Sequence, residues 1–300
     1  MHEKAVQRSH RARSLEKGSG IHLQVIMGNI QRKEYDATNN PAIKNPDWMS
    51  LVPDGKSLCD LSIPGTSKST WLEGGDFIQR QSWNLTTQYE AGIRFIDISL
   101  KYTHENLSVF SGTGQNHSFD AVFTDTINFL RNHSKEVILI RLCEEYSIFG
   151  KGKLFPQLVI RYVLDAGLSW FWKAPGIPTL GQVRGKIIIL RDFDGPVIGI
   201  PCKNFIVADH AYVPTIFDIG HKWASVKKNL TEAQNSKANN MYLTFTSGCS
   251  TGAYPYSVAR EINYKLYNFL EHSEKKKNRW GIIAMDFPGS YLIQTIIQNN

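Results

Sequence analysis

The sequence has few of the features that define disulfide-rich, zinc-binding or multidomain proteins. It contains four widely spaced cysteines, Cys59, Cys143, Cys202 and Cys249. They form no CxxC pair, and no histidine cluster has ligand spacing, so we expect buried free thiols rather than a disulfide framework or a zinc site. No proline-, glycine- or serine-rich stretch interrupts the patterned part of the chain, which favours one large domain over two.

Long apolar runs are also absent. The first 46 residues are polar and basic, and their one apolar run, Ile21 to Met27, is too short to span a bilayer. The run does not resemble a secretion signal either, so we expect a cytoplasmic protein. Secretion is the alternative, because five N-x-S/T sequons would matter in that pathway. These begin at Asn84, Asn106, Asn116, Asn132 and Asn229.

The net charge of +7 favours contact with anionic surfaces such as phospholipid head groups. Much of this charge sits in the leader and in the basic run at 275–279, where a solvated surface is the simpler interpretation. Basic and aromatic residues are not interleaved anywhere as a nucleic-acid groove requires, so we exclude nucleic acid as a main partner.

The remainder of the chain is rich in short apolar and β-branched runs, which predict strands. Eight such runs recur: 58–63, 93–100, 107–110, 136–142, 186–190, 204–208, 241–245 and 281–285. Eight is the strand number of a (β/α)8 barrel. Two runs, Val137 to Ile140 and Ile187 to Leu190, are continuously apolar, as expected for parallel strands covered on both faces.

Helical patterns alternate with these runs. Apolar residues recur three and four apart in 120–132, 155–166 and 256–272. The alternation predicts a parallel α/β fold. The second and third runs are too close for a crossover helix, so we expect an irregular TIM-like (β/α)8 barrel. We assign residues 1–46 to a poorly ordered leader and residues 47–300 to the barrel.

A set of short segments occurs in fixed order from Asp47 to the C-terminus. They are Asp47-Trp48-Met49, Leu61-Ser62-Ile63-Pro64-Gly65-Thr66, Ala91-Gly92-Ile93-Arg94-Phe95-Ile96-Asp97-Ile98, Phe129-Leu130 before Glu136-Val137-Ile138, Val207-Ala208-Asp209, Thr246-Ser247-Gly248 with Gly252-Ala253, and Met285-Asp286-Phe287-Pro288-Gly289. In these segments the chain resembles the bacterial-type phosphatidylinositol-specific phospholipase C X-domain family. The resemblance covers roughly five-sixths of the chain.

The resemblance implies a metal-independent cleavage in which the inositol 2-hydroxyl attacks its own phosphate and diacylglycerol leaves. This chemistry needs a base, an acid for the leaving alkoxide and a cation for the phosphoryl oxygens. Histidine suits the first two tasks because its pKa lies near neutral, and arginine suits the third because its fork matches two phosphate oxygens.

Several positions that match the family's catalytic residues carry other side chains here. The family's His-Asp pair after the first strand is Ser67 and Lys68, and its phosphate-binding arginine is Ser99. The general-acid histidine is Ser111. Asp97 and Asp286 are retained. The resemblance therefore predicts a catalytic site whose acid, base and cation positions are substituted.

Arg191 and Asp209 match substrate-contacting positions, and the tyrosine that stacks on the inositol ring matches Ala211, or Tyr212 if the register shifts by one. His104, His117 and His210 follow predicted strands and could act as displaced bases, although solvated loop histidines are the simpler interpretation. We expect no cofactor and no metal, because Asp97 and Glu144 lack further carboxylate ligands at matching positions.

Three functions remain open from the sequence. The first is an inactive phospholipase C-like protein that binds an inositol phospholipid head group or an anionic membrane surface. The second is an active phosphatidylinositol phosphodiesterase that uses displaced residues. The third is a structural partner protein without a ligand. The sequence does not define an oligomeric state.

Overall fold

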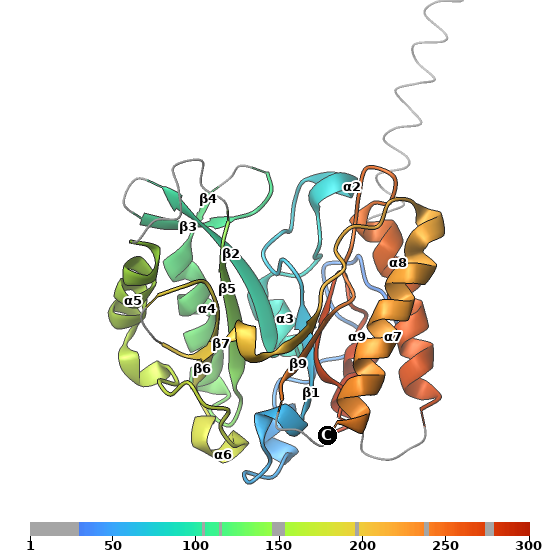
Figure 1. Cartoon of the computed structure of the whole chain (residues 1–300). Helices are drawn as coiled ribbons and strands as arrows, with labels where there is room; N and C mark the ends of the chain where they lie inside the picture. Colours follow the sequence, from blue (N-terminus) through green and yellow to red (C-terminus); the bar gives the residue numbers. More distant parts are fainter. Residues whose placement is uncertain are drawn as a thin grey trace, which may run out of the picture.

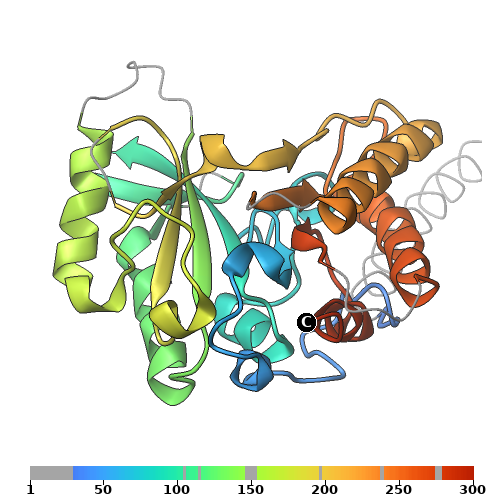
Figure 2. The same ribbon diagram turned by 60° about the horizontal axis from the view of Figure 1, so that its bottom comes forward.

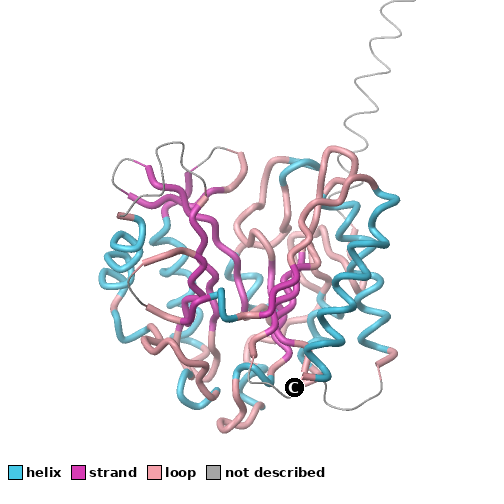
Figure 3. The backbone as a smooth tube through the Cα atoms, in the orientation of Figure 1, coloured by secondary structure: helices cyan, strands magenta, loops and turns pink. Residues whose placement is uncertain are grey.

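The structure, a computed structural model, describes residues 30–103, 106–113, 116–145, 154–195, 198–236, 240–273 and 279–300. Strands lie at the centre and helices lie outside them (Figures 1, 2 and 3). No helix in the described ranges is long and apolar enough to cross a bilayer.

The strands curl into an open barrel. Within the described residues the strand order is β7-β6-β5-β2-β1-β10-β9-β8, and each neighbouring pair on this path is parallel. A hairpin of β3 and β4 extends antiparallel from β2. The strands are β1 (Ser62–Thr66), β2 (Phe95–Thr103), β3 (Asn106–Phe110), β4 (Asn116–Ser118), β5 (Ile138–Glu144), β6 (Ile187–Asp192), β7 (Ile200–Pro201), β8 (Ile206–Ala208), β9 (Tyr242–Phe245) and β10 (Gly281–Met285).

The helices cover the outside of the strands. Figure 1 shows α4 and α5 beside β5 and β6, and α7, α8 and α9 on the opposite side. The α-helices are α2 (Gly75–Ile78), α3 (Leu85–Ala91), α4 (Phe119–Asn132), α5 (Phe155–Ala166), α6 (Leu180–Val183), α7 (Ile219–Asn235), α8 (Pro255–Glu271) and α9 (Ser290–Ile297). The 3-10 helices are η1 (Trp48–Leu51), η2 (Leu58–Asp60), η3 (Leu168–Trp170), η4 (Cys202–Asn204) and η5 (Ile216–Asp218).

Local sequence signals define the ends of several helices. The Asn84 side chain accepts a hydrogen bond from the Thr87 N–H and caps α3, which ends at Gly92 with a left-handed φ of 117°. A β-carbon at Gly92 would lie 2.8 Å from an Ile297 methyl carbon, so a larger residue would also need the Ile297 side chain to shift. Pro255 begins α8, where its missing N–H costs no helical hydrogen bond.

Strand alternation divides the apolar core into two layers. One layer fills the barrel and includes Phe95, Leu139 and Ile188. The other lies between the strands and the helices and includes Ile96 and Ile140. Because side chains alternate along a strand, each strand contributes to both layers and reads as continuously apolar.

The expected irregular parallel barrel is confirmed, with one correction to the assignment of its strands. The run at 107–110 forms β3, which pairs antiparallel with β2 and lies off the barrel path. The eighth parallel strand is instead β7, which consists of only Ile200 and Pro201. A two-residue strand leaves no periodic pattern, so the sequence did not indicate it.

Part of the expected leader packs on the barrel. Tyr35 and Asp36 are buried, and the Tyr35 ring lies 4.9 Å from the Tyr256 ring, centroid to centroid. Tyr35 also forms a β-bridge with Pro288. The packed part of the chain therefore begins before Asp47, where we expected the domain to start. Residues 1–29 lie outside the described residues.

A fully buried ion pair joins Arg94, just before β2, to Glu136, just before β5. Arg94 Nε lies 2.8 Å from Glu136 Oε2, and both side chains are 0% exposed. Arg94 also donates to the Pro46 carbonyl, while the Glu136 carboxylate accepts from the backbone N–H groups of Met49 and Ser50. The pair therefore fastens the segment before the barrel to two strands.

We expect Glu136→Gln to lower the free energy of unfolding by about 3–5 kcal/mol, because it leaves the buried Arg94 charge without its partner. Urea denaturation measures this change. Glu90→Gln is the control, because it removes an exposed ion pair with Lys44 and should cost about 1 kcal/mol or less. Equal losses in the two variants would contradict the structural role assigned to the buried pair.

Candidate functional site

Alternation along the strands brings polar side chains to the carboxyl end of the barrel. Phe95 of β2 faces the barrel interior, so Asp97 and Ser99 are the next inward positions. By the same alternation Ser67 and Asp286 face inward after Ile63 and Ala284. We call the surface around these residues the mouth. It lies at the top of Figure 1, near α2 and the β3–β4 hairpin.

Asp97 is the best-satisfied carboxylate of the mouth. It is 1% exposed, and its two oxygens accept from the Lys68 N–H at 3.1 Å and from Arg141 Nη1 at 2.6 Å. Arg141 also bonds Asp192 at 2.5 Å. Burial disfavours the charged guanidinium, but the nearby acids, Asp97 first, outweigh burial and raise the pKa of Arg141. Arg141 is therefore a permanent cation held by two acids.

Lys68 places its ammonium directly at Ser99. Lys68 Nζ donates to Ser99 Oγ at 2.7 Å and lies 5.3 Å from the centroid of the Trp71 ring. Glu145 is 3.7 Å from the same nitrogen. The backbone of Lys68 has a left-handed φ of 44°, which is uncommon outside glycine, and the Asp97 carboxylate holds it through the Lys68 N–H. A cation therefore lies beside Ser99, the residue predicted from the sequence to match the family's phosphate-binding arginine.

Asp286 is bound by Arg80, a residue that the sequence did not single out. Arg80 Nη1 donates to Asp286 Oδ2 at 2.7 Å, and Arg80 Nη2 donates to Cys249 Sγ at 2.9 Å. Gln81 fixes this segment, because its side chain donates to the carbonyls of Ser67 and Met285. Arg80 thus lies above the ends of β1 and β10.

Burial raises the pKa of Asp286 to about 6, against the opposing attraction of Arg80. The other carboxylate oxygen, Oδ1, is buried and has no hydrogen-bond partner within the described residues. Asp286 is therefore a carboxyl group that titrates near neutral pH and has one unused acceptor.

Lys222, in the first turn of α7, is the second unexpected cation. It is only 4% exposed, and burial lowers its pKa to about 8, although Asp209 and Asp286 act in the opposite direction. Lys222 lies three residues after Ile219 and four before Val226, on the buried stripe of α7. A lysine on an apolar stripe was a signal available in the sequence.

Arg191 is turned away from the mouth, whereas the end of β3 before Ser111 is tied to Trp71, the ring beside Lys68. Ser111, after β3, hydrogen-bonds Thr113 at 3.0 Å, and Trp71 bonds the neighbouring Phe110 carbonyl. Leu190 faces the barrel interior, so its neighbour Arg191 points to the opposite face of β6. The Arg191 guanidinium donates to the Gly195 carbonyl. Arg191 therefore lies on the outer face of β6 and is not directed into the mouth by the strand.

The predicted inositol-contacting residues after β8 lie on an exposed rim. Asp209 and Ala211 are exposed, and Tyr212 is 74% exposed. The Ala211 carbonyl accepts from the Cys249 N–H, which ties the rim to the loop after β9. Tyr212, and not Ala211, therefore presents a solvent-exposed aromatic ring on which a ligand could stack.

Of the three displaced histidines, only the side chain of His210 lies in the described residues, and it is exposed. His210 Nδ1 pairs with Ser225 Oγ at 2.8 Å. His104 and the side chain of His117 lie outside the described residues. Elsewhere in the described chain, histidine side chains hydrogen-bond Asp47 and the Asn268 carbonyl. Within the same ranges no group of three or more His, Cys, Asp or Glu side chains is arranged to hold a metal ion.

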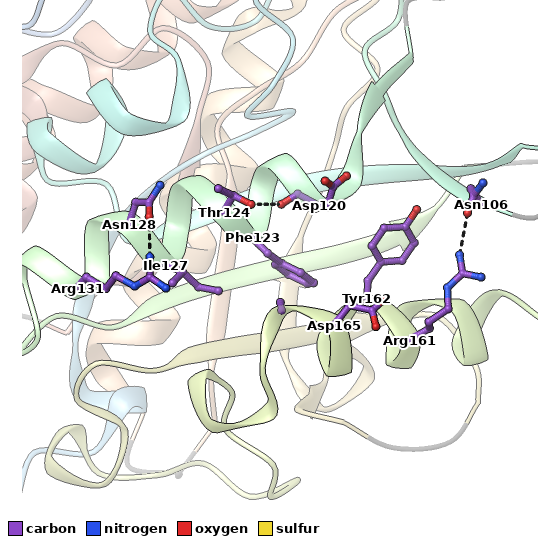
Figure 4. A pocket seen from close by; sticks show the side chains of 11 residues that line it. Asn106, Asp120, Phe123, Thr124, Ile127, Asn128, Arg131, Arg161, Tyr162 and Asp165 are labelled. Atoms are coloured by element: carbon purple, nitrogen blue, oxygen red, sulfur yellow. Dashed lines mark hydrogen bonds between the residues drawn. The ribbon is translucent and has the colours of Figure 1, made fainter.

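A separate hollow of about 540 Å³ lies between α4 and α5, outside the barrel (Figure 4). Its wall contains the rings of Phe123 and Tyr162. Arg161 donates to Asn106, and Arg131 donates to Asn128, so both arginines are engaged by amide side chains. The hollow is therefore a groove between two helices and not part of the mouth.

The open parallel barrel, with charged side chains at the carboxyl ends of its strands, has the architecture of barrel proteins that build their sites from these loops. The chain is 33% identical to the 1-phosphatidylinositol phosphodiesterase of Listeria monocytogenes over 89% of this chain and 90% of the relative. It is 25% identical to the Staphylococcus aureus protein of the same name, over 86% of this chain and 95% of the relative. No protein-family model matches.

Solved structures agree with this likeness. The phosphatidylinositol-specific phospholipase C of Listeria monocytogenes superposes with a TM-score of 0.76 at 28% identity, over 86% of this chain and 99% of that one. A Staphylococcus aureus phosphatidylinositol-specific phospholipase C gives a TM-score of 0.73 at 22% identity, which supports the fold, over 86% of this chain and 98% of that one. The chain therefore belongs to the bacterial phosphatidylinositol-specific phospholipase C family.

The buried lysine generates a prediction about stability. The pKa of Lys222 is about 8 in the folded protein and 10.5 without burial, so its contribution to stability is highest above pH 10.5, falls as the pH drops from 10.5 to 8 and is constant below that. We expect Lys222→Met to raise the free energy of unfolding at pH 7 by up to about 3 kcal/mol. The gain should disappear near pH 10.5 in urea denaturation series, and a gain that is equal at both pH values would contradict the burial of the charge.

Proposed function

We propose that this protein binds the head group of an inositol phospholipid at the mouth and cleaves it slowly or not at all. The observation that carries the proposal is the Lys68 ammonium at 2.7 Å from Ser99 Oγ. The family's cation position is substituted, but a cation reaches it from Lys68 in the turn after β1. An ammonium at this place can bind a phosphate oxygen as a point charge.

The groups for proton transfer are not preserved in the same way. Ser67 and Ser111 replace the family's histidines, and a serine hydroxyl has no pKa near neutral. The Asp286 carboxylate is bound to Arg80, which does not deprotonate. Each lost acid or base costs roughly two to four powers of ten in rate, so binding can persist where turnover does not.

Head-group binding tests the proposal directly. Glycerophosphoinositol, a soluble head group, is titrated by calorimetry against the unmodified protein, Lys68→Met and Lys44→Met. We expect Lys68→Met to weaken binding about ten-fold or more, because one charge-assisted hydrogen bond to phosphate is lost. Lys44 is exposed and paired with Glu90, so Lys44→Met should bind as the unmodified protein does. No binding by the unmodified protein would refute the proposal.

An active phosphodiesterase is the second candidate. It is favoured by Asp286, a buried carboxylate of the mouth whose Oδ1 has no hydrogen-bond partner within the described residues and could accept a proton. Release of cyclic inositol phosphate from phosphatidylinositol vesicles separates the two candidates. Turnover by the unmodified protein at about 1 per second or faster would replace the binding function with catalysis.

Restoring the family's residues should recover activity only when Asp286 is also released. Ser67→His with Ser111→His should remain inactive, because the Lys68 charge disfavours a protonated imidazole at position 67 and Arg80 holds Asp286. We expect measurable cyclic phosphate release after Lys68→Asp, Ser99→Arg and Arg80→Gln are added. Activity in the double variant alone would contradict the role given to Lys68 and Arg80.

A further inference from the structure

One acidic side chain of the mouth faces the Lys68 ammonium without forming a hydrogen bond to it. Glu145 Oε2 lies 3.7 Å from Lys68 Nζ, which is within ion-pair range but longer than a hydrogen bond. Ser99 Oγ, at 2.7 Å, takes one of the three N–H donors of the ammonium. Glu145 therefore acts on this cation through its charge, and in the described residues it leaves the ammonium with donors for a ligand oxygen.

The strand pattern directs Glu145 towards the mouth. Leu139 of β5 faces the barrel interior, and Arg141 and Glu145 continue the same alternation. The Glu145 N–H donates to the Leu100 carbonyl at 2.8 Å, which extends the pairing of β2 with β5 just past the end of β5. Glu144, one residue earlier, belongs to the opposite face of the strand. Two neighbouring acids therefore lie on different sides of β5.

The charges around Lys68 leave one negative charge in excess. Lys68 and Arg141 are the cations, and the carboxylates paired with them are Asp97, Asp192 and Glu145. Arg141 holds the first two at 2.6 and 2.5 Å, so Glu145 is the carboxylate that lies at Lys68. Two cations face three carboxylates. Any anion that binds Lys68 therefore enters a surrounding that is already slightly negative.

Such a surrounding distinguishes phosphates by their charge. A phosphodiester carries one negative charge at neutral pH, whereas a phosphate monoester carries close to two, because its second pKa is about 6. Both can accept a hydrogen bond from the Lys68 ammonium. The Glu145 carboxylate, 3.7 Å from the same nitrogen, repels the monoester about twice as strongly as the diester.

We propose that Glu145 is a specificity-determining residue of the mouth, which reserves the Lys68 cation for singly charged phosphodiesters and disfavours phosphate monoesters. This inference rests on the proposed function and deepens it, because it names the class of phosphate that the site takes. Glu145 acts through its charge on the bound phosphate, so the assignment is independent of whether the diester is cleaved.

The exposure of the two side chains sets the size of the effect. The side chains of Lys68 and Glu145 are 27% and 36% exposed, so solvent screens their charges in part. Two unit charges about 6 Å apart at such a place change a binding constant by about three-fold or more. The preference should therefore be measurable without being absolute.

The test compares two soluble ligands by calorimetry on the full chain at about pH 7.5 and constant ionic strength. Glycerophosphoinositol is the singly charged diester, and inositol 1-phosphate is the monoester. Glu145→Gln removes the charge, and Glu145→Asp retains it. Glu144→Gln is the matched control, because Glu144 precedes Glu145 on the same strand and faces the other side.

We expect the unmodified protein to prefer the diester. Glu145→Gln should strengthen binding of the monoester relative to the diester by about three-fold or more. Glu145→Asp and Glu144→Gln should keep the ratio of the two dissociation constants near that of the unmodified protein. A preference of the unmodified protein for the monoester, or an unchanged ratio in Glu145→Gln, would overturn the assignment.

A second measurement separates this inference from the proposed function. The indole N–H signal of Trp71, whose ring lies 5.3 Å from Lys68 Nζ, is followed by NMR during titration with dimethyl phosphate and with methyl phosphate. If glycerophosphoinositol does not bind, the proposed function is refuted, but the role of Glu145 stands if Glu145→Gln strengthens methyl phosphate relative to dimethyl phosphate. If neither small phosphate shifts the signal in the unmodified protein or in Glu145→Gln, the role of Glu145 is refuted as well.

Discussion

The position of the mouth depends on the buried ion pair between Arg94 and Glu136 at the opposite end of the barrel. The Arg94 N–H donates to the Pro64 carbonyl, and its own carbonyl accepts from the Leu139 N–H, so one residue connects β1, β2 and β5. The side-chain pair then holds this residue against the segment before the barrel. Because side chains alternate with period two, a slip of one residue here would turn Asp97 and Ser99 away from the interior.

The register that follows from this pair divides the mouth into two halves with different chemistry. On one side Asp97 lies opposite Arg141 across the β2–β5 ladder, and its oxygens are satisfied by Arg141 and the Lys68 backbone. On the other side Asp286 has only one satisfied oxygen. The first half is a closed network that orients Lys68, and the second half keeps unused capacity. A closed hydrogen-bond network and a carboxylate with an unsatisfied oxygen therefore occur in adjacent halves of the mouth.

The sequence predicted the barrel because its central strands are buried on both faces. Val137 to Ile140 and Ile187 to Leu190 are continuously apolar for that reason, and both form barrel strands. We assigned β3 to the barrel because a hairpin strand has the same apolar composition as a barrel strand. β7 gave no signal because a strand of two residues shows no hydrophobic periodicity. The rule that barrel proteins build their sites at the carboxyl ends of the strands identified Asp97 and Asp286 as candidate site residues. Arg80 could not be found this way, because it reaches Asp286 from a loop that lies 206 residues away in sequence.

The distribution of cations connects these observations to the proposed function. An imidazole beside Asp286 would exchange protons near neutral pH, whereas the guanidinium of Arg80 keeps its charge. Under the proposed function, a permanent cation at this carboxylate attracts phosphate without supplying a base. Under the same proposal Lys68, in the turn after β1, supplies a cation at Ser99. Electrostatic attraction needs only charge near the ligand, whereas proton transfer needs a group of suitable pKa within hydrogen-bond reach, which is the physical reason the proposed function keeps binding more readily than catalysis.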